Sequence, residues 1–319
     1  MIATRRCFTW TTICNLFSTV GAGIATALAI SGLSLGLPPL TAHAQSSPVP
    51  DGASVEKVAG GFQFTEGPIW YKGRLLFSDI PANTVYQWTP DAGSSVFLKP
   101  SGHANGLAVS PNGDLLLAQH DGQIGRLAAE DMVEPLVQEY NGKRLNSPND
   151  LTVTDDGTIY FTDPPYGVDE KNRELEFSGV YRLDPDGSLT LLTKTFARPN
   201  GICLSPDEST LYVNDSEKTA IWAYDVTEDG GITNERVFAT PEGDADGTTD
   251  GMAVDTNGNL YTTGPGGVWV YSPKGELLDR VSVPEAPTNV AFGGSNYETL
   301  FITARPNVYR LPVTVPGRE

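Results

Sequence analysis

The sequence predicts an all-β protein, a six-bladed β-propeller preceded by an N-terminal export signal. Three observations lead to this fold. Residues 60–312 show almost no helical periodicity, short β-rich runs recur there between Gly, Asn, Asp and Pro, and one motif is repeated six times. About 275 residues follow the signal, which is long enough to bury a hydrophobic core.

Residues 1–44 are predicted to be a signal peptide and residues 45–319 a single propeller domain. An apolar stretch follows the paired arginines, and Ala-His-Ala at 42–44 forms an A-x-A cleavage site. The segment "TRRCFTW" (4–10) favours the twin-arginine type of signal, with a Sec leader or an uncleaved anchor as alternatives. We therefore expect a periplasmic or secreted protein.

Cysteine content and charge exclude several function classes. After removal of the signal only Cys203 remains, so no intramolecular disulfide can form. The formal net charge of the whole chain is −18, which argues against nucleic acid and anionic membranes as partners. No further apolar run approaches the length of a membrane span, and the oligomeric state stays open.

The repeated unit is a polar residue, a short apolar strand, a turn that usually contains Gly, and a second strand ending in a small or polar residue. The six units are "EGPIWYKGRLLFSD" (66–79), "NGLAVSPNGDLLLAQ" (105–119), "NDLTVTDDGTIYFTD" (149–163), "NGICLSPDESTLYVND" (200–215), "DGMAVDTNGNLYTTG" (250–264) and "NVAFGGSNYETLFIT" (289–303).

These units fit four-stranded blades arranged around an axis, because radial repetition lets each sheet cover its neighbour's hydrophobic face. Third strands such as "GVYRL" (179–183) and "GVWVY" (267–271) are rich in aromatic and β-branched residues, which suit packing between blades. The last unit ends after three strands. We expect "SVEKVA" (54–59) to supply its outer strand and close the ring.

The first residue of each unit is polar, and the innermost strand of a blade lines the central channel. We therefore expect these six side chains to surround one mouth of it: Glu66, Asn105, Asn149, Asn200, Asp250 and Asn289. A ring of Asp, Glu and Asn offers only oxygen ligands, which favours one divalent cation, calcium before zinc, manganese or magnesium. The alternative is that Asn, Asp and Gly simply begin strands after turns.

Strand direction predicts what else lies at this mouth. If first strands begin there, second strands return to it, so the loop 164–179 is a candidate lid. The same reasoning places His120 and Arg305 near the mouth, and His103 and Arg144 in the entering loops. The alternative for each of them is a solvated residue of the rim.

At these residues the chain resembles the SMP-30/gluconolactonase/LRE-like family, and within it the exported bacterial gluconolactonases. The motifs that carry the resemblance are "TEGPIW", "RLNSPNDL", "YFTDPPYG", "RPNGICLSPD" and "DGMAVDTNGNLY". It implies a six-bladed propeller with one divalent metal, often calcium. It also implies that Glu66, Asn200 and Asp250 hold the metal, and that Asn149 is a further ligand or a substrate contact, while Asp150 faces the other side of its strand.

Two positions depart from the family pattern. Animal members carry a substrate-binding Arg where this chain has Ser147, and Arg144 is a candidate replacement. Members that hydrolyse organophosphates hold a second calcium with an Asp and a His, whereas this chain has Ala253 and Ala291 at the matching positions.

The expected activity is hydrolysis of a sugar lactone, such as D-glucono-1,5-lactone, a small-molecule substrate. The metal would polarise the carbonyl, and Asp250 is the candidate catalytic base that activates water. The candidate substrate contacts are Asn105, Asn149, His103 and Arg144. Alternatives are a non-sugar lactone or organophosphate as substrate, or a propeller that only binds a ligand. The G-x-S-x-G match at 32–36 lies in the apolar leader, away from any strand-to-helix turn.

Overall fold

The structure is a computed structural model that describes residues 46–129 and 131–318. The predicted signal peptide, residues 1–44, lies outside the described residues. In the described part nearly all secondary structure is strand, and the only helical element there is one short 3-10 turn, η1 (Glu170–Asn172). This part contains no helix that is long and apolar enough to cross a membrane.

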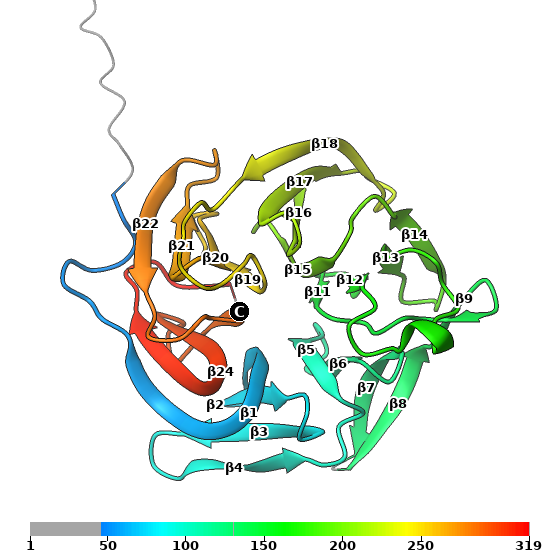
Figure 1. Cartoon of the computed structure of the whole chain (residues 1–319), viewed down its shortest axis with the longest axis horizontal. Helices are drawn as coiled ribbons and strands as arrows, with labels where there is room; N and C mark the ends of the chain where they lie inside the picture. The colour runs from blue at the N-terminus through cyan, green and yellow to red at the C-terminus, as the bar shows by residue number, and fades with distance from the viewer. Residues whose placement is uncertain (1–45, 130, 319) are drawn as a thin grey trace, which may run out of the picture. The chain divides into compact units, whose positions relative to one another are not determined.

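Five sheets of four or six strands are arranged around a central axis, which is the architecture of a β-propeller (Figure 1). In each four-stranded sheet the strands are hydrogen-bonded in chain order. The first strand lies next to the axis and the fourth at the periphery (Figure 1). The predicted all-β propeller is therefore confirmed.

The four-stranded sheets correspond to the second, third, fourth and fifth sequence units. Their strands are β5 (Ala104–Val109), β6 (Leu115–Gln119), β7 (Gln123–Ala129) and β8 (Met132–Val137); β11 (Leu151–Val153), β12 (Ile159–Asp163), β13 (Gly179–Leu183) and β14 (Leu189–Thr193); β15 (Pro199–Leu204), β16 (Thr210–Asp215), β17 (Ala220–Val226) and β18 (Ile232–Ala239); β19 (Met252–Val254), β20 (Leu260–Gly264), β21 (Gly267–Tyr271) and β22 (Leu277–Ser282). A small ladder of β9 (Glu139–Tyr140) and β10 (Lys143–Arg144) precedes the third unit.

The sixth and first units share one six-stranded sheet where the sequence predicts two separate blades. Its strands, in spatial order, are β23 (Asn289–Gly293), β24 (Thr299–Pro312), β1 (Glu56–Tyr71), β2 (Arg74–Asp79), β3 (Thr84–Thr89) and β4 (Gly93–Leu98). The two units are joined because β1 and β24 are long strands that each pair with both neighbours.

The ring is closed by the segment that the sequence predicts. Lys57 pairs with Tyr309 and Ala59 with Val308 in an antiparallel ladder, so the start of β1 lies beside the end of β24. The pairing of 56–59 with the third strand of the last unit is thereby confirmed. Residues near the two ends of the described chain are joined in one sheet.

The hydrophobic core lies between neighbouring sheets. One cluster combines Tyr212 and Ile221 of the fourth unit with Leu260 and Trp269 of the fifth, all of them buried. The fifth and sixth units meet through Tyr261 on β20 and Phe292 on β23, whose ring centroids are 5.0 Å apart. Aromatic side chains therefore pack between blades, as the third-strand and hairpin sequences predict.

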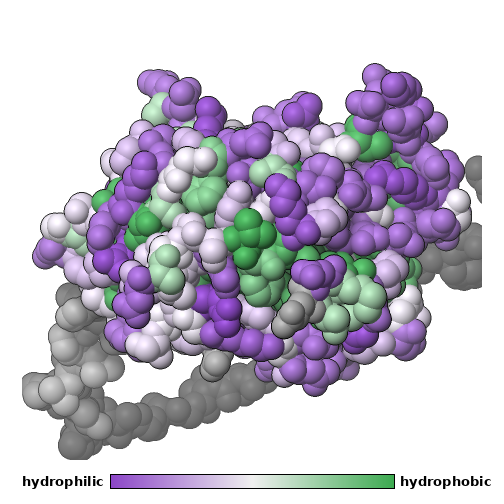
Figure 2. Space-filling model, turned by 90° about the horizontal axis from the view of Figure 1, so that it is seen from below, coloured by the Kyte–Doolittle hydropathy of each residue, from purple (hydrophilic) through white to green (hydrophobic). Residues whose placement is uncertain are grey.

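The outer edge of the propeller is mainly hydrophilic, with hydrophobic groups collected in the middle of the face in Figure 2. Large exposed hydrophobic side chains occur on outermost strands, for example Val96 on β4, Met132 on β8 and Val237 on β18. The outermost strands thus contribute little to the core, and the buried material lies closer to the axis.

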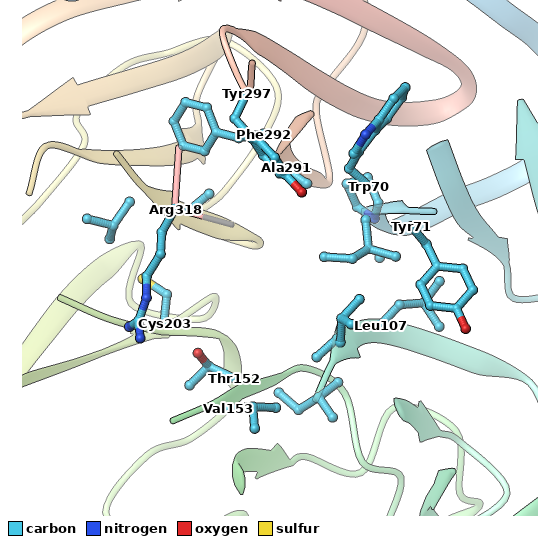
Figure 3. A pocket seen from close by; sticks show the side chains of 18 of the residues that line it. Trp70, Tyr71, Leu107, Thr152, Val153, Cys203, Ala291, Phe292, Tyr297 and Arg318 are labelled. Carbon is cyan, nitrogen blue, oxygen red and sulfur yellow. The ribbon is translucent and has the colours of Figure 1, made fainter. Parts of the chain in front are cut away.

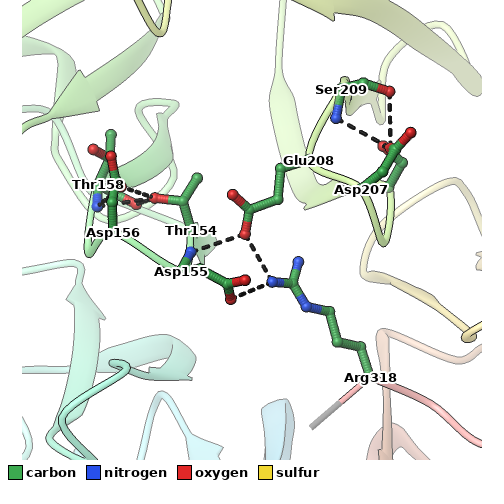
Figure 4. Close-up of polar contacts among 9 residues, drawn as sticks. Thr154, Asp155, Asp156, Thr158, Asp207, Glu208, Ser209 and Arg318 are labelled. Atoms are coloured by element: carbon green, nitrogen blue, oxygen red, sulfur yellow. Dashed lines mark hydrogen bonds and ion pairs between the residues drawn. The ribbon is translucent and has the colours of Figure 1, made fainter.

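The C-terminal segment crosses the ends of several hairpins on one face of the propeller. Thr256 donates its N–H to Pro316 O at 2.9 Å, and Gly317 donates to Tyr297 O at 3.0 Å. The Arg318 guanidinium donates to Glu208 Oε1 at 2.7 Å and to Asp155 (Figure 4). The segment therefore connects hairpin turns of the sixth, fifth, fourth and third units.

Candidate functional site

A cavity of about 440 Å³ opens where the first strands begin and the second strands end; we call it the near cavity. Residues from all six sequence units line it. They include five of the six predicted first-position residues and two of the predicted rim residues: Glu66, Asn105, Asn149, Asn200, Asp250, His120 and Arg305. Strand direction therefore brings these residues together at one end of the hairpins, as predicted.

Asn289, the sixth first-position residue, lies elsewhere. It lines a second, larger cavity on the opposite side, and its Oδ1 accepts the Val290 N–H at 2.8 Å. Its side chain also fills the space beside Gly251, where an added Cβ would lie 1.8 Å from Asn289 Oδ1. Asn289 thus packs within the ring of first strands and does not face the near cavity.

Glycines after the polar residues allow the first strands to approach closely. Gly106 donates its N–H to Asn149 O at 2.8 Å, and Gly201 donates to Asp250 O at 3.1 Å. An added Cβ on Gly201 would lie only 2.1 Å from that same carbonyl oxygen of Asp250. The recurrent Asn-Gly and Asp-Gly pairs therefore serve backbone contact between blades, which brings the preceding polar side chains together.

Asp150 occupies the position that glycine holds in four of the other units. It is buried, and its Oδ1 accepts the N–H of Leu151 at 2.9 Å. The carboxylate lies against the neighbouring strand, since a Cβ on Gly106 would be 2.5 Å from Oδ1. Asp150 lines the cavity on the opposite side, while Asn149 lines the near cavity, so the two side chains alternate as expected for a strand.

Three carboxyl groups lie close enough to influence one another. Burial raises the pKa of Glu66 to about 8. The hydrogen bond from the Gly67 N–H opposes this rise, and the negative charge of Asp150 adds to it. Burial also raises the pKa of Asp150 to about 7. The pKa of Asp250 is raised well above its usual value by burial and then by the charges of Glu66 and Asp150. The protein alone therefore leaves negative charge here poorly compensated.

One atom of this group has no hydrogen-bond partner among the described residues: Oδ1 of Asp250, which is buried. Burying a carboxylate oxygen without a partner costs folding free energy unless a cation or a ligand binds to it. The described residues contain no cluster of three or more His, Cys, Asp or Glu side chains arranged for a metal. The four predicted metal ligands instead combine two carboxylates with two amides. All four offer oxygen atoms, and this composition fits a hard divalent cation.

His120 is held against the first-position residue of the second unit. Asn105 Nδ2 and His120 Nε2 are 3.2 Å apart. Burial, followed by the charge of His103, lowers the pKa of His120 to about 4. The ring is therefore neutral near pH 7, and in the tautomer with Nε2 unprotonated it accepts the hydrogen of the Asn105 amide.

Two predicted substrate contacts are engaged away from the near cavity. His103 Nδ1 lies 2.9 Å from Asp121 Oδ1, and both side chains are largely exposed. Arg144 donates from Nη1 to the carbonyl oxygens of Leu145 at 2.9 Å and Asn146 at 2.8 Å. Neither residue lines the near cavity, because local partners turn the side chains toward the loops that carry them.

Several residues that line the near cavity were not identified from the sequence. Tyr166 comes from the predicted lid loop, and the Arg198 guanidinium lies 5.5 Å from the centroid of its ring. Arg198 also pairs with Glu217 at 3.6 Å. Ser216 and Glu217 directly follow the second strand of their unit, so the argument that predicted His120 could have found them as well.

Ser147 fixes the lid loop. Its hydroxyl donates to Pro164 O at 2.5 Å and accepts the Gly167 N–H at 2.8 Å. Tyr166 lies between these two attachment points. The residue that departs from the family pattern therefore positions the loop that contributes Tyr166 to the cavity.

The cavity on the opposite side, which we call the far cavity, has a volume of about 820 Å³. Apolar side chains such as Leu107, Val153 and Phe292 surround it, and Arg318 of the C-terminal segment lies at its edge (Figure 3). Ala253 and Ala291 are part of this lining. The far cavity thus adds a large apolar lining to the polar groups of Asp150 and Asn289.

Comparison with known proteins agrees with the resemblance seen in the sequence. Residues 64–305 match the model of the SMP-30/gluconolactonase/LRE-like region. The chain is 41% identical over 289 residues to the gluconolactonase of Zymomonas mobilis, which covers 81% of this chain and 80% of that protein. It is 28% identical over 248 residues to the pentonolactonase XacC of Haloferax volcanii, covering 75% and 80%. A solved gluconolactonase from Xanthomonas campestris superposes with a TM-score of 0.77 at 35% identity, covering 83% of this chain and 91% of that one.

Proposed function

The chain belongs to the SMP-30/gluconolactonase/LRE-like family, and we propose that it hydrolyses a sugar lactone with the help of one divalent cation. D-glucono-1,5-lactone, which yields D-gluconate, is the first candidate substrate. Glu66, Asn149, Asn200 and Asp250 would hold the cation, with calcium the first candidate and zinc, manganese or magnesium as alternatives.

The observation that carries this proposal is the convergence of polar first-position side chains around a buried carboxylate oxygen that has no partner in residues 46–129 and 131–318. Glu66 and Asp250 bring two negative charges to the near cavity, and Asn149 and Asn200 add neutral oxygen donors. A dication would compensate the two charges without excess. The third carboxylate, Asp150, lies on the other side of the strand.

The six-unit organisation is part of the proposal. Counting the shared six-stranded sheet as two blades gives six blades, each with a first strand that starts near the axis. Four of these starts would supply the cation's ligands, and Asn105 from a fifth would bind substrate beside the neutral ring of His120.

A bound cation would supply electrophilic polarisation of the lactone carbonyl. The chain's own residues would position the reactants. Asp250, whose Oδ1 has no hydrogen-bond partner among the described residues, would accept a proton from an attacking water, and Asn105 and Asn149 would donate hydrogen bonds to hydroxyl groups of the sugar. Tyr166 and Arg198 contact each other in the lining of the same cavity and would limit access of bulk water.

Chelation tests the proposal directly. The purified protein is treated with EDTA, dialysed, and assayed on glucono-1,5-lactone, a pentonolactone, a non-sugar lactone and an organophosphate after addition of calcium, zinc, manganese or magnesium. We expect loss of lactone hydrolysis on chelation and its return with one of the metals, while circular dichroism shows that the strands persist. Full activity after complete metal removal would refute the metal-dependent mechanism, and no turnover on the whole panel would favour a binding protein.

We also propose that the protein is exported to the periplasm or secreted, because paired arginines, an apolar stretch and an A-x-A site precede residue 45. Replacing Arg5 and Arg6 together by lysine should leave unprocessed protein in the cytoplasm if the twin-arginine route is used. Normal processing of this variant, measured by cell fractionation, would instead indicate a Sec leader.

A further inference from the structure

Arg305 differs from every other arginine in residues 46–129 and 131–318. Each of the others donates to a carboxylate, a side-chain amide or a backbone carbonyl of the protein. For the Arg305 side chain no hydrogen bond, ion pair or ring contact to a described residue is found. This is unexpected in a chain with 39 acidic and 21 basic residues, where carboxylates are abundant.

The backbone holds Arg305 firmly at the near cavity. Arg305 lies in β24, pairs with Thr65 of β1, and its carbonyl oxygen accepts the Thr65 hydroxyl at 2.8 Å. Thr65 directly precedes Glu66, so the arginine is fixed beside a candidate metal ligand. The exposed side chain lines the near cavity together with Glu66 and Asp250.

The backbone at Arg305 adopts a conformation that favours glycine. Its φ angle is 53°, in the left-handed region that L-residues with a side chain rarely occupy. Residues in such sparsely populated conformations cluster at active sites and ligand clamps, so the φ angle of Arg305 motivates a hypothesis of function. An unpaired cation and a strained backbone at the same cavity residue are two independent observations.

The other charged residues that line the near cavity indicate what Arg305 would bind. Arg198 is already compensated by Glu217, whereas Arg305 has no carboxylate partner in the described part of the chain. The deeper part of the cavity holds the proposed metal ligands Glu66 and Asp250, which leave that space to the cation and the reacting carbonyl. An anionic group therefore fits only at the rim, at the end of the substrate remote from the reacting carbonyl.

On the basis of the proposed lactonase activity, we infer that Arg305 is a specificity residue that binds an oxyanion substituent on the part of a sugar lactone remote from its carbonyl. A planar guanidinium with several N–H donors matches a phosphate, sulfonate or carboxylate group. Lactones that carry such a group are then preferred over neutral ones because of Arg305.

The experiment compares kcat and KM of the wild type and of Arg305→Gln on three probes: 6-phospho-D-glucono-1,5-lactone, D-glucaro-1,4-lactone and neutral D-glucono-1,5-lactone. We expect the variant to raise KM for the two charged probes about 10-fold, the usual scale for losing a charge-assisted hydrogen bond, with a smaller change for the neutral one. A larger effect on one charged probe identifies phosphate or carboxylate as the preferred group. Arg305→Lys should restore part of the preference.

Two further variants separate binding from stability. Arg310→Gln removes an arginine of the same strand that pairs with Glu56, away from the near cavity, and should leave all KM ratios unchanged. Arg305→Gly should unfold at the same or a higher temperature than the wild type, because glycine tolerates the left-handed φ angle, yet lose the preference for charged lactones.

The inference is overturned if the wild type shows no preference for the charged probes, or if Arg305→Gln keeps it. Hydrolysis of none of the lactones would contradict the proposed function itself. Calorimetric titration with 6-phospho-D-gluconate then tests Arg305 separately: binding that Arg305→Gln abolishes supports the inference, and binding that is absent or unaffected by the change overturns it.

Discussion

The two ends of the propeller channel are built from the same hairpins but present different groups. Five of the six polar residues at which first strands begin line the near cavity, and one buried carboxylate oxygen of Asp250 there has no partner among the described residues. The far cavity is lined by apolar side chains of the first strands together with polar residues such as Asp150 and Asn289, and the carboxylate of Asp255 close to it is fully hydrogen-bonded.

This difference separates function from stability. Asp255 accepts hydrogen bonds from Asn257, Asn259 and Tyr261 and so holds a turn together. Asp250 instead keeps one buried oxygen without a partner among the described residues, and its pKa is raised well above its usual value by burial and by the neighbouring charges of Glu66 and Asp150. Polar groups that satisfy one another stabilise a structure, and those left unsatisfied are available to a ligand.

Replacing one aspartate at each end of the channel by asparagine should give the largest difference in activity and stability. Asp250→Asn should lower kcat on the lactone by about 10²- to 10⁴-fold, the range for loss of a general base, while the protein stays folded. Asp255→Asn should leave kcat unchanged and lower the midpoint of urea unfolding. Equal loss of turnover in the two variants, measured at matched folded concentration, would contradict the division between the two ends.

Close contact between first strands is the next feature to break. A methyl group at Gly201 would meet Asp250 O, so Gly201→Ala should destabilise the fold by about 3 kcal/mol, the upper end for an overpacked site, and weaken metal binding. Gly187→Ala, at a turn with φ 87° and open space around it, should cost only about 1 kcal/mol of backbone strain. Urea unfolding and calorimetric metal titration measure both effects, and similar losses in the two variants would argue against the contact.

Protonation of His120 should link stability of the near cavity to pH. The pKa of His120 in the folded protein, about 4, lies below the usual histidine value of 6.5, so between these values the unfolded chain binds more protons and stability falls as pH falls. From pH 7 to pH 4.5 the wild type should lose about 2 kcal/mol more than His120→Gln. Parallel pH profiles for the two proteins in denaturant titrations would show that the ring is not held neutral.

The smallest effect is expected at the far end. Arg318→Ala removes ion pairs to Glu208 and Asp155 that are partly exposed, so the loss should be about 1 kcal/mol and shrink in high salt. Lactone turnover should not change. A large loss of turnover would mean that the C-terminal segment influences the near cavity across the whole channel.

Sequence reasoning was most successful where one residue type recurs in register. The six hairpins, the closing pair at 56–59 and the polar residues at strand starts all follow from the repeat, because alternation fixes which side chain faces which way. The same logic separated Asn149 from Asp150 and placed His120 and Arg305 at the near cavity.

Loop side chains could not be placed in this way. His103 turns to Asp121 and Arg144 to two carbonyl groups, and these local partners carry no periodic signal. Tyr166 reaches the cavity because Ser147 fixes its loop through two hydrogen bonds. The union of the first and last units in one sheet was also missed, since only the long strands β1 and β24 reveal it.

The ladder between 56–59 and 308–310 has a consequence for synthesis of the protein. Residues that line the near cavity come from Phe64 at one end of the chain to Arg305 at the other, and they are brought together only when this ladder forms. A ribosome-bound chain therefore cannot offer the complete cavity until the residues beyond 305 have emerged. Loading of any metal must follow translation, so the compartment in which the finished chain folds determines which ion it meets first.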